Sequence, residues 1–188
     1  MAPLTECVSS LYGAYRLARF DSRGLQYFNV GAVGFFRSFT AALFVAPFAF
    51  VNWILLPPYG QPFSKAIYAF FMLVVTYVIS WCVTPFIMAG ISLVLDRKHT
   101  YVRFAVAYNW SAVPQNIVYI VVVTAAVIAG FSNDTVFGLA LIILLWSFIY
   151  TGFVVHRALD VPVVTASGIV LIEFLLRICI ELLIIISR

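Results

Sequence analysis

Four long stretches of this chain contain no Asp, Glu, Lys, Arg or His. They run over residues 38–64, 66–95, 104–133 and 135–155, which is 27, 30, 30 and 21 residues. About 20 apolar residues carry an α-helix across the hydrocarbon core of a bilayer. Because lipid offers the backbone no hydrogen-bond partner, a spanning segment is a helix or a strand of a closed barrel, and these runs lack the alternation of barrel strands. The sequence therefore predicts four membrane-spanning helices.

The composition excludes a water-soluble globule. Of the 188 residues, 64% are apolar and 10% are charged, against about half and about a quarter in soluble domains. Folded in water, such a chain would expose apolar patches larger than monomers tolerate. The three cysteines and two histidines are scattered, which predicts neither a disulfide framework nor a metal site. We predict an all-α, polytopic integral membrane helix bundle that forms one domain over residues 1–188.

A fifth apolar segment, residues 161–187, carries charges. Glu173, Arg177 and Glu181 are spaced i, i+4 and i+8, so they form one charged face of a helix. A charged side chain at the bilayer centre costs about 2.5–3.5 kcal/mol on insertion scales, so this face must point to protein or water. The segment is a fifth span or a helix lying in the interface. We predict five spans, over about 35–56, 66–94, 104–129, 135–156 and 162–186.

Two interpretations of the charged face stay open. In the first, Arg177 pairs with Glu173 or Glu181, and the ladder fixes how the helix packs or docks it against a partner subunit. In the second, Glu173, which lies closest to mid-membrane, carries a proton or an ion or binds a polar substrate. The sequence does not decide between them.

The basic residues indicate the orientation. Eight of the 11 Lys and Arg residues fall in segments that five spans place on one side: Arg16, Arg19, Arg23, Arg37, Arg97, Lys98, Arg103 and Arg157. Basic loops stay cytoplasmic. We therefore predict that the N-terminus is cytoplasmic and that, with five spans, the C-terminus lies on the other side of the membrane. The basic surplus follows from this topology and does not indicate a nucleic-acid partner.

Residues 1–30 form a cytoplasmic or interfacial segment rather than a secretory signal, because they lack an unbroken apolar core and a cleavage motif. An apolar stripe runs along one side of a helix and consists of Leu4, Val8, Leu11, Tyr15 and Ala18. Arg16, Arg19 and Arg23 lie beside it. This pattern predicts an interfacial helix whose arginines bind anionic lipid headgroups. An ordinary juxtamembrane segment is the alternative.

The third predicted span has a polar wedge. Five side chains project into one arc of about 120°: Tyr108, Asn109, Gln115, Asn116 and Tyr119. Pro114 removes one backbone donor, frees the carbonyl of Trp110 and predicts a kink, as do Pro47 in the first span and Pro85 in the second. A kink beside polar amides can line a cavity, whereas Asn and Gln can also simply join helices. In the second span, Thr76, Ser80 and Thr84 form a hydroxyl stripe.

Two stretches carry a resemblance: Gly34-Phe35-Phe36-Arg37-Ser38-Phe39 and Ala107-Tyr108-Asn109-Trp110-Ser111-Ala112-Val113-Pro114-Gln115. The chain resembles small, uncharacterised bacterial inner-membrane proteins of alphaproteobacterial type. This resemblance implies a bacterial inner membrane, which would make the C-terminus periplasmic. Its short five-helix layout over about residues 30–186 is similar, more remotely, to the Yip domain family of membrane-trafficking proteins. The chain departs from the trafficking members in lacking a substantial soluble N-terminal region. Neither resemblance implies catalytic or ligand residues.

The sequence favours a non-enzymatic protein without a cofactor or a metal, since it contains none of the common nucleotide, metalloprotease or hydrolase motifs. The first hypothesis is an accessory or assembly subunit whose charged face docks to other membrane subunits or to further copies of the chain. The alternative is a small transporter or channel with a polar pocket around Glu173 and Asn116. In both, the bilayer is the surrounding partner.

The predicted topology places the connection around Tyr59 outside and the connection around Lys98 inside, because the second is basic and the first is not. Single cysteines introduced near these two positions should therefore react with membrane-impermeant maleimide from opposite faces of intact cells and inverted vesicles. Labelling of both from the same face would contradict the topology.

Overall fold

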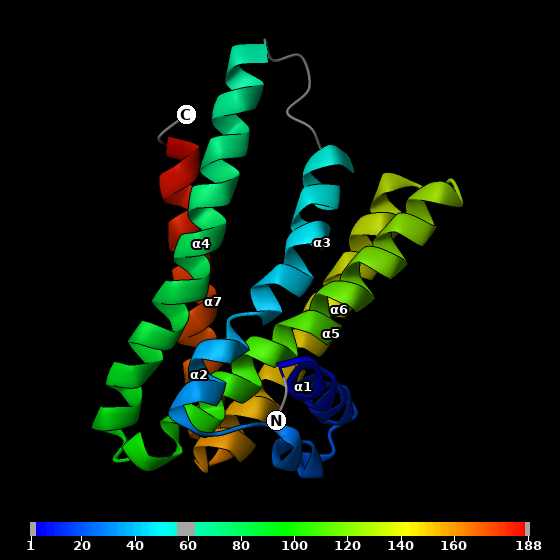
Figure 1. Ribbon diagram of the computed structural model, residues 1–188. Helices are drawn as coiled ribbons and strands as arrows, with labels where there is room; N and C mark the ends of the chain where they lie inside the picture. The colour runs from blue at the N-terminus through cyan, green and yellow to red at the C-terminus, as the bar shows by residue number, and fades with distance from the viewer. Residues whose placement is uncertain (1–2, 56–62, 187–188) are drawn as a thin grey trace.

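The computed structural model describes the backbone of residues 3–55 and 63–186, and the side chains of these residues except 3, 52–55, 63–66, 69, 177 and 180–186. Every regular element in these ranges is helical (Figure 1). The elements are α1 (Pro3–Ala18), the 3-10 helix η1 (Ser22–Tyr27), α2 (Ala32–Ser38), α3 (Ala41–Leu55), α4 (Phe63–Val94), η2 (Lys98–Thr100), α5 (Tyr101–Ile128), α6 (Asn133–Leu159) and α7 (Val163–Ile186). The predicted all-α bundle is confirmed for the described residues.

Four helical segments are long and apolar enough to cross a membrane. They are Ala32–Val51, Phe70–Val94, Lys98–Ile128 and Asn133–Leu159. They agree closely with the first four predicted spans, because the length of an uncharged run determines where a helix can cross lipid. The described apolar part of α7 is shorter, Val163–Leu176. The structure thus supports a membrane-embedded bundle with four candidate spans among the described residues.

The first candidate span is not the single helix predicted over 35–56, because α2 ends at Ser38 and α3 begins at Ala41. At the break, the amides of Phe39 and Thr40 donate to carbonyls three residues earlier rather than four. The hydroxyls of Ser38 and Thr40 also donate to carbonyls three residues earlier, both at 2.7 Å. Such hydroxyls compete with the helical amides and favour a turn. Residue 56 lies outside the described residues.

The central helix of the bundle is α5. Helices α1, α2, α3 and α6 pack around it, and α7 packs against α6. The buried core gathers where α5 begins and α6 ends, and its members include Phe104, Ala105, Val106, Ala107, Val154, Val155, Ala158 and Leu159. At the opposite end of the α5–α6 pair (Figure 1), Ile128 and Phe137 are exposed. One end is therefore tightly packed by protein, while the other presents apolar side chains suited to lipid.

Helix α1 lies against this core through a face that the sequence analysis did not single out. Ala14 and Leu17 are fully buried, and the buried hydroxyl of Tyr150 on α6 donates to the carbonyl of Ala14 at 3.0 Å. The predicted apolar stripe points largely outward, with Leu4 and Val8 exposed by 81% and 67%. The helix therefore has two apolar sides, one packed on the bundle and one facing away from it.

An ion pair between buried Glu6 and partly exposed Arg37 holds α1 to the start of the first candidate span. Glu6 is buried, and its carboxylate accepts hydrogen bonds from Arg37 Nη1 at 2.7 Å and from Asn29 Nδ2 at 3.1 Å. A carboxylate taken out of water needs both an opposite charge and hydrogen-bond donors. Arg37 supplies the opposite charge and Asn29 supplies a further donor, so α1 is fixed to the start of the first candidate span by charge as well as by packing.

The basic connections lie at this same end of the bundle. Arg103 Nε donates to the carbonyl of Ala158 at 2.8 Å, and the Thr100 hydroxyl donates to the carbonyl of Leu159 at 3.1 Å. These bonds satisfy carbonyls at the end of α6 that lack a partner within the helix. They join η2 and the start of α5 to the end of α6. The N-terminus lies at this end of the molecule and the C-terminus at the other (Figure 1).

Helix α1 and η1 approach closely at Gly13 and Gly24. A Cβ atom at Gly13 would lie 2.8 Å from the carbonyl oxygen of Gly24 and 3.0 Å from Cβ of Tyr27. We expect Gly13→Ala to destabilise the protein by about 1–3 kcal/mol through overpacking and to lower its thermal unfolding midpoint in detergent. Gly90→Ala is the matched control, because Gly90 lies inside α4 with open space around its Cβ position. Equal midpoints for the two variants would contradict this packing.

Asp21, between α1 and η1, accepts hydrogen bonds from Arg23 Nε at 3.0 Å and Arg16 Nε at 2.8 Å. The bonds from Arg23 and then Arg16 hold the pKa of the Asp21 carboxyl well below its usual value of about 4. Because the pKa is lowered in the folded state, the stabilisation is complete above about pH 4 and is lost as the pH falls through the folded pKa.

We therefore expect acidification below about pH 4 to loosen α1 and η1, measured as lower protection of their amides, that is, faster hydrogen exchange relative to the intrinsic rate at each pH. Asp21→Asn should exchange faster already at neutral pH and should lose this part of the acid response. An Asp21→Asn variant with the wild-type exchange profile would show that the carboxylate does not hold these elements.

Candidate functional site

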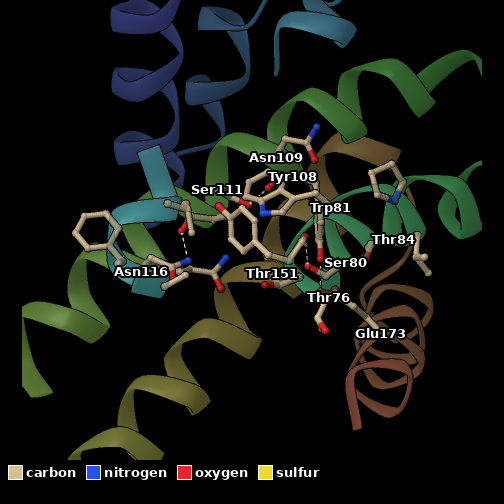
Figure 2. Close-up of a pocket in the computed structure, with 18 of the residues that line it drawn as sticks. Thr76, Ser80, Trp81, Thr84, Tyr108, Asn109, Ser111, Asn116, Thr151 and Glu173 are labelled. Atoms are coloured by element: carbon tan, nitrogen blue, oxygen red, sulfur yellow. Dashed lines mark hydrogen bonds between the residues drawn. The ribbon is translucent and has the colours of Figure 1, made fainter. Parts of the chain in front are cut away.

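A partly open cavity of about 390 Å³ lies between α3, α4, α5, α6 and α7. At ~30 Å³ per water it has room for roughly a dozen waters, which suits a small molecule. Its polar side chains are Thr76, Tyr77, Ser80, Trp81 and Thr84 of α4, Tyr108, Asn109, Ser111, Gln115, Asn116 and Tyr119 of α5, Thr151 of α6 and Glu173 of α7 (Figure 2). Val45, Phe48 and Ala49 line it from α3.

The cavity lies near the middle of the helices that line it. Glu173 is ten residues from the start of α7, which corresponds to about 15 Å along the helix. Thr76 and Asn116 lie at similarly central positions in α4 and α5. Polar groups at this depth have no access to bulk water unless the protein provides it.

Two polar faces that the sequence identified on separate helices meet at this cavity. All five members of the predicted wedge line it: Tyr108, Asn109, Gln115, Asn116 and Tyr119. The hydroxyl stripe of Thr76, Ser80 and Thr84 lines it from α4. The structure therefore brings these residues together around one space.

Glu173 joins α7 to the same lining. The hydroxyl of Tyr108 on α5 donates to Oε1 of Glu173, which links two helices that are far apart in the chain. The side chains of Arg177 and Glu181, the other two members of the predicted charged face, lie outside the described residues. The backbone of α7 continues as a helix to Ile186.

Asn109 closes the inner wall of the cavity toward the buried core. Its Nδ2 donates to Ser38 Oγ at 2.8 Å, and Ser38 Oγ donates in turn to the carbonyl of Phe35 at 2.7 Å. Asn109 and Ser38 are both buried. This pair satisfies polar groups at the break between α2 and α3 and ties that break to the central helix.

Four polar lining residues were missed by the sequence analysis: Tyr77, Trp81, Ser111 and Thr151. Tyr77 and Trp81 each follow a member of the hydroxyl stripe, and their ring centroids lie 6.1 Å apart. The Tyr77 hydroxyl donates to the carbonyl of Ala42 at 2.5 Å and so joins α4 to α3. Thr151 reaches the cavity from α6. The sequence could have indicated Tyr77 and Trp81, because each directly follows a member of the hydroxyl stripe. Thr151 carries no such indication, because it stands alone in an apolar run.

The three predicted kink prolines all lie inside helices: Pro47 in α3, Pro85 in α4 and Pro114 in α5. Of these, Pro85 lines the cavity, and its carbonyl accepts a hydrogen bond from the Tyr101 hydroxyl at 2.9 Å. A proline in a helix removes one backbone donor. At Pro85 this donor is lost to the carbonyl of Trp81, four residues earlier, while the bond from Tyr101 joins α5 to α4.

The arginines predicted to bind lipid headgroups lie in or beside α1 and η1, away from the cavity. Arg16 and Arg23 pair with Asp21, and Arg19 donates to the hydroxyl of Tyr15 at 3.2 Å. The Arg23 side chain is 73% exposed, so its pairing with Asp21 is open to solvent. The cavity and this basic surface are therefore two separate features of the molecule.

The lining of the cavity offers hydrogen bonds and one carboxylate. Among the residues described, His, Cys, Asp and Glu side chains do not gather in groups of three, and the described lining holds Glu173 as its one acidic side chain. Hydroxyls, amides, aromatic rings and a carboxylate suit the recognition of a small polar solute.

No family model, no curated protein and no solved structure matches this chain, so the Yip-like resemblance stays a prediction.

Proposed function

We propose that this chain is a small transporter or channel, non-enzymatic, which binds a polar solute in the cavity around Glu173 and Asn116 and passes it across the membrane. The observation that carries this proposal is the 390 Å³ cavity at the middle of the helices. Polar side chains in hydrocarbon are costly and mark solute pathways. Here hydroxyls, amides and a carboxylate from four helices surround one hollow.

The proposal includes α7 as a fifth span. Its 24 residues correspond to about 36 Å of helix, enough to cross a bilayer. With Glu173 turned to the cavity, the charge that would oppose insertion has a polar environment. We further propose a bacterial inner membrane with the packed, basic end of the bundle in the cytoplasm, because basic connections favour that side.

In this arrangement α1 lies at the cytoplasmic interface. Its outward side carries exposed Leu4 and Val8 together with Tyr12 and Tyr15, and Arg19 lies over the Tyr15 ring at 5.7 Å. Aromatic and basic side chains in this combination suit the headgroup region of an anionic membrane. The interfacial helix would thus be held by the bundle on one side and by lipid on the other.

Helix α4 is the element best suited to admit a solute. Between Phe70 and Thr84 none of its described side chains is buried, and Phe71 and Val78 are more than half exposed. Few contacts with neighbouring helices mean a low local resistance to movement. The cavity lies along this part of α4, whereas its inner wall at Asn109 is firmly tied. We propose that α4 moves and that α5 and α6 stay fixed.

Docking to another subunit is the second candidate function. The exposed outer half of α4 would offer a long apolar surface to a partner helix or to a further copy of this chain. The polar lining favours the first candidate, because a purely docking role requires no hollow beside a carboxylate at this depth.

Flux through the purified protein in liposomes tests the first candidate. We expect uptake of small polar solutes above that of empty liposomes, and we expect Glu173→Gln to lower it at least about tenfold, because a hydrogen bond to a charged group contributes about 1.5–3 kcal/mol. Asp134→Asn is the matched control, since Asp134 is exposed at the start of α6. Equal flux in both variants, or no flux above empty liposomes for ions, amines, alcohols and carboxylates, would overturn the proposal.

A further inference from the structure

Helix α4 changes its packing at Pro85. From this residue onward one face of the helix is buried in the bundle, through Pro85, Met88 and Ser92 at successive turns. Between Phe70 and Thr84, in contrast, none of its described side chains is buried. The most apolar 18-residue window of this candidate span is 6% buried, against 22–28% in the other three. We call residues 85–94 the anchored half of α4 and residues 70–84 the loose half.

A proline stands at the boundary between the two halves. Pro85 has no amide proton, so the carbonyl of Trp81 lacks its helical donor, and helices bend at such positions. The carbonyl of Pro85 accepts a hydrogen bond from the Tyr101 hydroxyl of α5 at 2.9 Å. The anchored half is therefore tied to the central helix at the point where the loose half can begin to turn.

The loose half is tied to α3 through Tyr77. The Tyr77 hydroxyl donates to the carbonyl of Ala42 at 2.5 Å. Farther along the two helices, the rings of Phe70 and Phe50 meet edge to face, with centroids 6.4 Å apart. Both helices line the cavity, so the hydrogen bond from Tyr77 holds two of its walls together.

Other walls of the cavity are joined without α4. Tyr108 donates to Glu173 and so links α5 to α7. Asn109 donates to Ser38 at 2.8 Å and so links α5 to the break between α2 and α3. Neither bond involves α4, so the loose half can move away from α3 while these walls stay in place.

We propose that the loose half of α4 is the gate of the cavity, that it swings about Pro85, and that the Tyr77–Ala42 hydrogen bond holds it closed. This inference rests on the proposed transport function and specifies how access to its site is controlled. The loose half runs toward the end of the bundle opposite the basic end (Figure 1), so its swing opens the cavity toward that end. Phe71 lies 14 residues from Pro85, about 21 Å along the helix, so a change of about 20° in the bend moves it by roughly 7 Å.

Distances between pairs of spin labels, measured by double electron–electron resonance on the full chain in nanodiscs, test the gate. Cysteines introduced at Phe71 in the loose half and at Leu93 in the anchored half are each paired with one at Leu145 on α6; all three positions are more than half exposed. The three native cysteines are replaced by alanine. We expect Tyr77→Phe to increase the population with a displaced label at 71 about two- to tenfold, the range for one hydrogen bond between neutral groups. The 93–145 distances should stay unchanged.

Two further variants control the measurement. Tyr119→Phe removes a phenol hydroxyl from the same cavity on α5 and should keep the wild-type distances. Pro85→Ala restores a backbone amide at the hinge and, combined with Tyr77→Phe, should remove the displaced population, because a continuous hydrogen-bond ladder stiffens the helix. Circular dichroism and thermal unfolding identify any variant that fails to fold, and Tyr77→Phe keeps the ring that lies beside Trp81.

A 71–145 distribution that Tyr77→Phe leaves unchanged, or a shift of equal size in the 93–145 pair, would overturn the gate. Liposome flux of ions, amines, alcohols and carboxylates separates this inference from the transport function, and we expect Tyr77→Phe to raise it about two- to tenfold. If flux depends on Glu173 while the label at 71 does not respond to Tyr77→Phe, the gate fails and the transport function stands. If the label responds and no solute passes, the transport function and the role of the gate both fail, and the hinge at Pro85 is confirmed.

Discussion

Hydrocarbon offers no hydrogen-bond partner to a polar group, and the whole architecture depends on that constraint. It requires the backbone to be helical wherever it meets lipid. It also explains why the polar groups at the break between α2 and α3, which lies within a candidate span, are hydrogen-bonded. The Ser38 and Thr40 hydroxyls donate to backbone carbonyls there, and the Asn109 amide donates to Ser38. The same constraint turns the polar side chains of α4, α5 and α7 toward one another and away from lipid.

Packing divides the bundle into a firm part and a loose part. At the basic end, α1, α5 and α6 share a dry core that is held further by Tyr150, Arg103 and the Glu6–Arg37 pair. Toward the other end, α4 has few neighbours and its described side chains are largely exposed. A cavity at the boundary between a fixed group of helices and a loosely held one can change its access with little loss of core packing. This is the property that a transport site needs.

Which solute the cavity can bind depends not only on which polar residues are present but also on which of their hydrogen-bond donors are already used within the protein. Thr, Ser, Asn and Tyr can each donate or accept, so their presence alone does not select a solute. The hydroxyl protons of Thr76 and Ser80 and one of the two Nδ2 protons of Asn116 are used by backbone carbonyls of their own helices. These groups therefore offer a solute mainly their oxygen atoms, together with the second Asn116 proton.

The sequence by itself determined that the chain is helical, where most of its helices run, and which side of α5 is polar. These follow from the length of uncharged runs and from the angle of each residue around its own helix, both local properties. It did not indicate the break after Ser38, the buried face of α1 or the contributions of Tyr77, Trp81 and Thr151. Those depend on which helices become neighbours. Only the tertiary structure decided that the wedge of α5, the hydroxyls of α4 and Glu173 surround one space, because helix pairing and rotation arise from packing between distant segments.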